Sequence, residues 1–259
     1  MFPVLFTVWD VPVQTHEFFI ATGVLVAAVV FVGEARRRGR WSDDLWAIVA
    51  GALIGGGLFA RFGTGIQYLA EAPDPTVLGL FTQAGRSILG GLVGAYVGAR
   101  VAKKLIGYRR STGDLFAPAV AVGMAIGRVG CFLTEQLGTV TSLPWGITVT
   151  PGQAARMSFC PDCQLGQPMH PSFLYEIGFH VFAFVALGIL RRDPRFDGRL
   201  FPIYVGSYGV FRFMLEFVRG NPPLWFGLSG SHIFLMAGFT VAAATGVARL
   251  ARRRPVPVG

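Results

Sequence analysis

The sequence is dominated by apolar runs that are long enough to cross a membrane as helices. The run from Leu115 to Leu133 contains a single charged residue, Arg128. About 20 helical residues cross the hydrocarbon core of a bilayer. A charged side chain at the centre of such a helix costs about 2.5–3.5 kcal/mol on insertion scales. Arg128 is therefore expected to face a partner or a polar ligand rather than lipid.

The composition agrees with a membrane-embedded chain. Of the 259 residues, 53% are hydrophobic and 14% are charged, and the mean hydropathy is +0.54. Soluble domains carry about 25% charged residues, so we expect one all-α integral membrane domain over residues 1–259. The net charge is +9, but the basic residues form short clusters between apolar runs instead of one patch. That distribution reports membrane topology, and no nucleic-acid partner is expected.

A seven-transmembrane-helix bundle is predicted, and the basic clusters set its orientation. Clusters at 36–40, 103–110, 191–195 and 252–254 follow every second run. Because cytoplasmic loops are rich in Lys and Arg, the N-terminus is expected outside, the C-terminus in the cytoplasm, and residues 134–171 in an extracytoplasmic insertion. Residues 1–12 lack a basic segment, so no cleaved signal peptide is expected. The predicted spans are approximately Phe18–Gly33, Leu45–Leu69, Ser87–Ile106, Leu115–Leu133, Ser172–Leu190, Leu200–Val218 and Ser231–Leu250.

Arginines also lie at the predicted outer ends of the spans, where topology does not explain them. One interpretation is a buried ion-pair network, because Arg212 and Glu216 are four residues apart and share a helix face. The other is an anion site, since the arginines outnumber the nearby acids, chiefly Glu216, and guanidinium matches phosphate. At the outer leaflet, the available anion is a phospholipid head group. The arginines are Arg61, Arg86, Arg128, Arg212 and Arg219.

A small-anion or lipid transporter is a third possibility, but two features weigh against it. One half of the chain does not repeat in the other, as it does in many transporters. The inner halves of the predicted spans also hold almost no charge, whereas a transporter needs a polar path to the cytoplasm.

Histidines and cysteines give weaker signals. His170, Tyr175 and Glu176 open the fifth span at the level of the arginines, and His170 is read as an interfacial side chain or a proton acceptor. Cys160 and Cys163 in the external loop are expected to form a disulfide, with a metal site or a redox pair as alternatives. No metal or cofactor is expected. The remaining candidates, expected to be packing or interfacial residues, are Cys131, His16, His180 and His232.

Five segments together resemble the motifs of the prolipoprotein diacylglyceryl transferase family. Each motif alone is weak, but they occur in order over nearly the whole chain. The segments are Ala60-Arg61-x-Gly63, Gly127-Arg128-x-Gly130-x-Phe132, His170-Pro171-x-x-Leu174-Tyr175-Glu176, Phe211-Arg212-x-x-x-Glu216-Phe217-x-Arg219 and Leu228-Ser229-x-x-His232.

The resemblance implies a reaction and a set of site residues. The reaction moves a diacylglyceryl group from phosphatidylglycerol to the lipobox cysteine thiol of a lipoprotein precursor, among the lipids at the outer face of the bacterial inner membrane. Arg128 and Arg212 would bind the phosphate, and Glu216 would orient Arg212. The implied substrate-binding residues are Arg61, Arg86, Arg219, His170, Tyr175, Glu176, Gly90 and Gly91.

The sequence departs from the family pattern at several positions. Leu89 stands where the family has histidine, Phe18 replaces tyrosine, Cys131 replaces asparagine and Phe173 replaces glutamine. Three interpretations therefore stay open. One is a divergent transferase in which Arg86 takes part of the missing histidine's role. The others are a related activity with a different acceptor and a membrane protein that binds phospholipid without catalysis.

Overall fold

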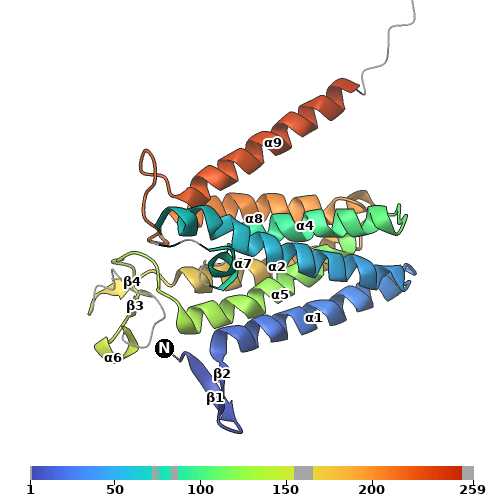
Figure 1. Cartoon of the computed structure of the whole chain (residues 1–259). Coiled ribbons are helices and arrows are strands. Elements are labelled where there is room, and N and C mark those ends of the chain that lie inside the picture. Colours follow the sequence, from blue (N-terminus) through green and yellow to red (C-terminus); the bar gives the residue numbers. More distant parts are fainter. Residues whose placement is uncertain (1, 72–73, 75, 83–86, 155–165, 253–259) are drawn as a thin grey trace, which may run out of the picture. The chain divides into compact units, whose positions relative to one another are not determined.

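The computed structural model describes residues 2–71, 74, 76–82, 87–154 and 166–252 (Figure 1). The chain is mostly helical and divides into two compact units, Met1–Gly33 with Gly113–Gly259 and Glu34–Thr112. The elements of the first unit are β1 (Val4–Val8), β2 (Val11–Gln14), α1 (Thr15–Arg37, whose last turn enters the second unit), α5 (Gly113–Thr134), β3 (Ile147–Thr148), α6 (Pro151–Ala154), β4 (Pro168–Met169), α7 (Ser172–Leu190), the 3₁₀ turn η1 (Pro194–Phe196), α8 (Leu200–Glu216) and α9 (Gly230–Arg252). The second unit contains α2 (Asp44–Glu71), α3 (Val77–Thr82) and α4 (Ile88–Leu105).

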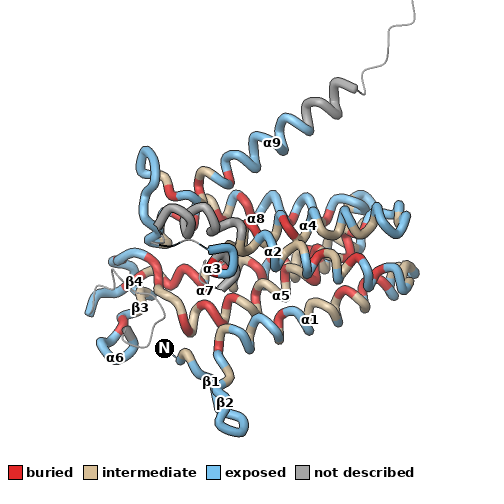
Figure 2. Tube along the Cα trace, in the orientation of Figure 1, coloured by how far each residue is buried: buried red, intermediate tan, exposed pale blue. Residues whose placement is uncertain are grey.

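Four helices in the described part of the chain are long and apolar enough to cross a membrane. They are α1, the Asp44–Arg61 part of α2, α5 and α7. Large apolar side chains such as Val29 and Phe182 are exposed, as expected for surfaces that meet lipid. Figure 2 shows exposed positions in pale blue along these helices. The expectation of an all-α membrane protein is confirmed. Helices also cover the other predicted spans, as α4, α8 and α9, but a bundle of seven crossings stays a prediction.

A hairpin that the sequence analysis did not predict precedes α1. β1 and β2 pair antiparallel, and Trp9 and Asp10 between them have φ values of 53° and 64°. Positive φ at both central residues is characteristic of the tight turns that join hairpin strands. The Thr15 N–H donates to the Pro3 carbonyl at 2.9 Å, and α1 begins at Thr15, ahead of the predicted start at Phe18.

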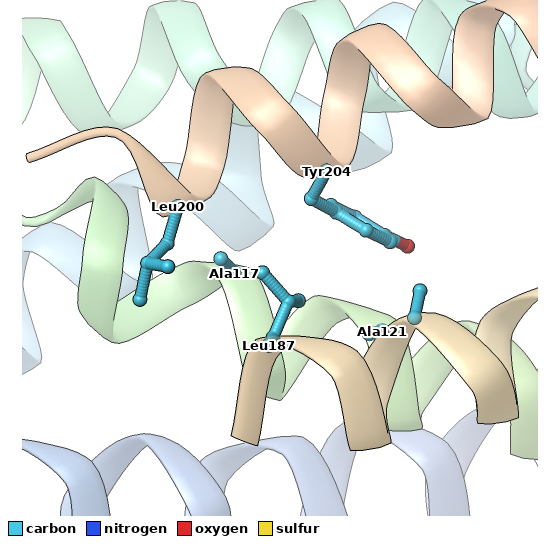
Figure 3. Packing of buried hydrophobic residues seen from close by; sticks show 6 residues of the cluster. Ala117, Ala121, Leu187, Leu200 and Tyr204 are labelled. Atoms are coloured by element: carbon cyan, nitrogen blue, oxygen red, sulfur yellow. The ribbon is translucent and has the colours of Figure 1, made fainter. Parts of the chain in front are cut away.

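The centre of the first unit lies where α5, α7 and α8 meet. Figure 3 shows Ala117 and Ala121 of α5 facing Leu187 of α7 and Leu200 and Tyr204 of α8. The small side chains on α5 let its neighbours approach closely, which favours helix association in lipid.

Asp114 fixes the start of α8 against α5. Its buried carboxylate accepts hydrogen bonds from the backbone N–H groups of Gly198 at 2.5 Å and Leu200 at 3.1 Å. The first N–H groups of a helix have no hydrogen-bond partner within the helix. The Asp114 carboxylate of α5 supplies an acceptor for such N–H groups at the start of α8. The sequence analysis did not foresee this contact, because it joins residues far apart in the chain.

Close backbone contact also fixes α1 on α5. A Cβ atom on Gly130 would lie 3.2 Å from the Cα atom of His16, and one on Gly23 would lie 2.7 Å from the carbonyl oxygen of Gly123. The glycines therefore permit a contact that larger residues would block. The contact at Gly130 places His16 beside the C-terminal end of α5.

The second unit is built on close packing of α2 against α4. A Cβ atom on Gly51 would lie 2.8 Å from the Gly98 carbonyl oxygen, and one on Gly90 would lie 2.6 Å from the Phe59 carbonyl oxygen. Gly90, Gly94 and Gly98 of α4 follow one another at four-residue spacing and all face α2 in this contact.

Residues 135–154 and 166–171 of the predicted insertion form a small structure of their own. β3 pairs antiparallel with β4, and Leu137, Val149 and Met169 are buried together beneath them. Cys160 and Cys163 lie outside the described residues, so the expected disulfide stays a prediction.

Candidate functional site

Three helices of the first unit bring polar side chains to one buried point. Arg128 of α5 forms an ion pair with Glu176 of α7. Its Nη2 atom donates to the Tyr208 hydroxyl of α8 at 3.3 Å, and this hydroxyl donates to Glu176 Oε2 at 3.1 Å. All three side chains are buried. Arg128 therefore faces polar partners, as the sequence analysis expected.

Arg219 extends this cluster just beyond the end of α8. Its Nη1 atom lies 2.9 Å from Glu176 Oε1, so Glu176 joins two arginines. The Phe173 ring contacts both guanidinium groups, with their Cζ atoms 4.4 Å (Arg219) and 5.7 Å (Arg128) from its centroid. An aromatic face attracts a cation at these distances. Phe173 thus holds two cations beside one carboxylate.

A second carboxylate lies on the far side of Arg219. Glu135, one residue past α5, has its Oε2 atom 3.9 Å from Arg219 Nη2 and its Oε1 atom 3.4 Å from His16 Nε2. Burial acts to raise the pKa of Glu135, but the bond to His16 and the nearby arginines outweigh it and lower the pKa to about 2. Glu135 is therefore an anion at neutral pH.

Cys131 lies within the same cluster. Its Sγ atom is 3.7 Å from His16 Nε2 and 3.9 Å from Arg128 Nη1. His16, Cys131 and Glu135 each offer one donor atom, and these atoms lie within 4.8 Å of one another. They are a group of described residues that can hold a metal ion.

Arg212 and Glu216 form a neighbouring network on α8. The two side chains pair, as their four-residue spacing predicted. Glu216 also accepts from Asn221 Nδ2 at 2.6 Å and from the Ser229 hydroxyl at 2.5 Å, and His232 Nδ1 lies 3.2 Å from that hydroxyl. These bonds hold the Glu216 carboxylate in one orientation.

The charges in these two networks balance. The carboxylates of Glu135, Glu176 and Glu216 match the guanidinium groups of Arg219, Arg128 and Arg212. The expected excess of arginine is wrong for this part of the chain, because Glu135 and Glu176 come from other elements and were not counted as partners. Two buried nitrogens of these networks nevertheless have no hydrogen-bond partner: Arg128 Nε and His232 Nε2.

A profile of the family described as prolipoprotein diacylglyceryl transferase matches residues 3–249. The chain belongs to the prolipoprotein diacylglyceryl transferase family. It is 32% identical over 224 residues to the phosphatidylglycerol–prolipoprotein diacylglyceryl transferase of Leifsonia xyli, covering 81% of this chain and 66% of that protein. With the Nocardia farcinica protein of the same name, identity is 31% over 83% of this chain and 47% of that protein. The chain thus spans less than two thirds of the length of these two relatives. The Geobacter sulfurreducens protein of that name is 32% identical over 87% of this chain and 85% of its own length.

Two departures from the family motifs lie in the arginine cluster. Cys131 puts a thiol beside His16 and Arg128. Phe173 puts an aromatic ring between Arg128 and Arg219. The interpretation of Cys131 and His16 as packing residues therefore missed their polar partners. His180 and His232 are buried against aromatic rings. Each also has a polar partner, since His180 Nδ1 lies 3.0 Å from the Tyr204 hydroxyl and His232 Nδ1 lies 3.2 Å from the Ser229 hydroxyl.

The other predicted site residues lie in different places. The His170 Nδ1 atom is 3.2 Å from the Tyr175 hydroxyl, which also accepts from Trp145 Nε1 at 2.8 Å. Gly90 and Gly91 lie on α4 in the second unit, where they face α2. Arg61 lies on α2 in the same unit, and Arg86 lies outside the described residues. Their part in a common site stays a prediction.

Sequence reasoning missed three residues of the site. Tyr208 precedes Arg212 by four residues, and this helical spacing could have identified it. Glu135 follows Cys131 by four residues, but it was placed in the loop. Asn221 lies beyond the end of α8, where periodicity gives no signal.

Proposed function

We propose that this protein transfers the diacylglyceryl group of phosphatidylglycerol to the lipobox cysteine thiol of a lipoprotein precursor. The names of its relatives support this activity. The single observation that carries it is the buried Arg128, whose Nε donor has no hydrogen-bond partner although both of its Nη atoms have one. Such a donor suits the phosphate oxygen of a phospholipid head group.

The reaction divides into bond making at sulfur and bond breaking at phosphate. The acceptor thiol loses its proton, because thiolate is the nucleophile. The sulfur then forms a bond to the terminal glyceryl carbon, and the bond from that carbon to the phosphate oxygen breaks. Glycerol phosphate leaves with the electron pair. Positive groups fixed beside the departing oxygen stabilise the negative charge that develops there.

Arg128 and Arg212 are the proposed catalytic residues, and Glu216 is a positioning residue for Arg212. Glu176 pairs with Arg128 and Arg219 and so positions both guanidinium groups, and Arg219 is proposed to bind the substrate. His170 and Tyr175 form a hydrogen-bonded pair that would contact the head group or the acceptor peptide. From the family resemblance, Arg61, Arg86, Gly90 and Gly91 are also proposed to bind the substrate.

The setting of the reaction is also a proposal. Seven helices would cross the bacterial inner membrane, with the N-terminus outside and the C-terminus in the cytoplasm. Residues 134–171 would lie outside, on the side where precursors emerge. The basic clusters that follow every second span support this orientation.

Transfer assays on Arg128 variants test the proposal. The purified protein is supplied with phosphatidylglycerol and a peptide bearing a lipobox cysteine, and thioether product and glycerol phosphate are measured. Loss of a preorganised charge-stabilising donor lowers rates by about 10²–10³, so Arg128→Ala is expected to lose at least this much. Arg128→Lys is expected to recover little, because lysine lacks the planar fork. Arg195→Ala is the matched control, since Arg195 is exposed and pairs with Asp193.

A phospholipid-binding protein without turnover is the second candidate. The departures from the family motifs at Phe18, Leu89, Cys131 and Phe173 favour it. Phosphatidylglycerol binding that depends on Arg128, with no thioether product from wild-type protein, would establish this candidate and reject the transferase. Lipid or anion flux across liposomes that depends on Arg128 would instead indicate a transporter.

A further inference from the structure

We propose that His16, Cys131 and Glu135 bind one Zn²⁺ ion and that its open fourth position takes the acceptor thiol. The first part stands on the geometry of the three donor atoms alone. The second part rests on the proposed transferase function. The expectation of no metal site considered only the loop cysteines and the nearby His170.

The distances from His16 Nε2 to its two neighbours fit a shared ion. His16 Nε2 lies 3.4 Å from Glu135 Oε1 and 3.7 Å from Cys131 Sγ. In a tetrahedral zinc site with bonds of about 2.0–2.3 Å, neighbouring ligand atoms are about 3.3–3.8 Å apart. Both separations from His16 fall in that range, and all three donor atoms lie within 4.8 Å of one another.

The backbone holds the three donors in place. Cys131 and Glu135 are four residues apart, and the Glu135 N–H donates to the Cys131 carbonyl at 2.7 Å, so the two side chains share a helix face. Contact between Gly130 and His16 fixes the start of α1 on this face. The Phe2 N–H donates to the Leu133 carbonyl at 3.0 Å and ties the hairpin to the same place.

The chemistry of the donors selects a borderline metal ion. Imidazole nitrogen, thiolate sulfur and carboxylate oxygen are the ligand types of Zn²⁺. Thiolate and carboxylate together neutralise its charge. Arg128 and Arg219 both contact Glu176, so with Glu135 bound to the metal these two guanidinium groups share the Glu176 carboxylate. Glu17 Oε1 lies 3.8 Å from His16 Nδ1, where a carboxylate can orient the ligating ring.

Three protein ligands leave one coordination position open, as in catalytic zinc sites. The His16 and Glu135 side chains are 25% and 39% exposed, so this position is reachable from solvent. A thiol that coordinates zinc releases its proton to water and binds as thiolate. Its sulfur would then attack the glyceryl carbon next to the phosphate held by Arg128, and the carbon–oxygen bond to phosphate would break.

Cobalt substitution tests the metal site. The full-length protein is treated with chelator and titrated with Co²⁺, with Cys160 and Cys163 replaced by serine so that they contribute no sulfur. We expect about one Co²⁺ per chain, visible d–d bands of tetrahedral intensity and a sulfur-to-cobalt charge-transfer band. Cys131→Ser should abolish the charge-transfer band, and His16→Gln and Glu135→Gln should weaken binding at least tenfold. His170→Gln is the control and should bind normally. Absence of the band, or its survival in Cys131→Ser, overturns the site.

Binding of a thiol at the fourth coordination position of the metal ion is tested separately, by the intensity of the charge-transfer band. A peptide with a free cysteine should roughly double the charge-transfer band of the cobalt protein, and its serine analogue should not change it. An unchanged band overturns the thiol role. Transfer assays separate this result from the proposed function. Equal rates in the chelated and zinc-loaded protein overturn the thiol role but leave the transferase standing. A doubled band without any transfer supports the site and rejects the transferase.

Discussion

At the scale of single residues, Glu176 is the carboxylate of the site that forms ion pairs with two arginines. Its buried carboxylate contacts Arg128, Arg219 and Tyr208. Glu176→Gln keeps the size of the side chain but leaves two buried arginines without this partner. Removing one member of a buried ion pair costs about 3–5 kcal/mol, so the midpoint of thermal unfolding in detergent should fall clearly. Asp193→Asn, in an exposed pair, should leave the midpoint unchanged.

Added phosphatidylglycerol makes this experiment specific. If a phosphate can replace the missing carboxylate charge, the lipid should raise the unfolding midpoint of Glu176→Gln more than that of wild type. An equal increase would contradict the view that the lipid phosphate reaches the arginine cluster.

Phe173 offers a second test at residue scale. Its ring lies against the Arg128 and Arg219 guanidinium groups and is buried. Phe173→Leu keeps an apolar side chain but removes the aromatic face. A desolvated cation–π contact is worth about 1–2 kcal/mol, so kcat/KM for diacylglyceryl transfer should fall about 5–30-fold. Phe182→Leu on the exposed face of the same helix is the control. An equal loss in both variants would argue against a specific role for the Phe173 ring.

At the scale of elements, the α2–α4 contact depends on glycines in particular positions. A Cβ atom on Gly51 would lie 2.7 Å from the Ala102 Cβ and 2.8 Å from the Gly98 carbonyl oxygen, whereas one on Gly57 would meet nothing within 4 Å. Gly51→Ala should therefore lower the unfolding midpoint and the yield of folded protein, and Gly57→Ala should not. Thermal unfolding of the two purified variants measures the difference. Equal unfolding midpoints would mean that α2 and α4 can move apart at Gly51 without loss of stability.

The elements also show how far the sequence could predict the structure. The helices were predictable because apolar runs of membrane-spanning length permit little else. The pair of Arg212 and Glu216 was predictable from its spacing within one helix. The contacts of Glu176 with Arg128 and Arg219 were not, since they join different elements and depend on helix rotation. The hairpin before α1 escaped notice because its strands are short and its turn residues, Trp9 and Asp10, lack the usual Asn-Gly signal.

At the scale of the whole molecule, the distribution of charge separates two roles of arginine. Arginines between the helices cluster in segments such as 36–40 and 191–195, where they orient a chain in a membrane. Arg128, Arg212 and Arg219 instead lie among carboxylates within one unit. The first set is proposed to orient the chain during insertion, and two of its members, Arg37 and Arg38, also pair with Glu34 in the folded protein.

Labelling of single cysteines tests the proposed orientation of the whole chain. In a background without native cysteines, Ser142→Cys lies in the predicted external insertion and Arg195→Cys in a predicted cytoplasmic loop; both positions are exposed. Because basic loops stay on the cytoplasmic side, a membrane-impermeant maleimide should label Ser142→Cys in intact spheroplasts. It should label Arg195→Cys only after the membrane is broken. The reverse pattern would place the arginine cluster at the inner leaflet, away from precursors that emerge outside, and the proposed acceptor would then be wrong.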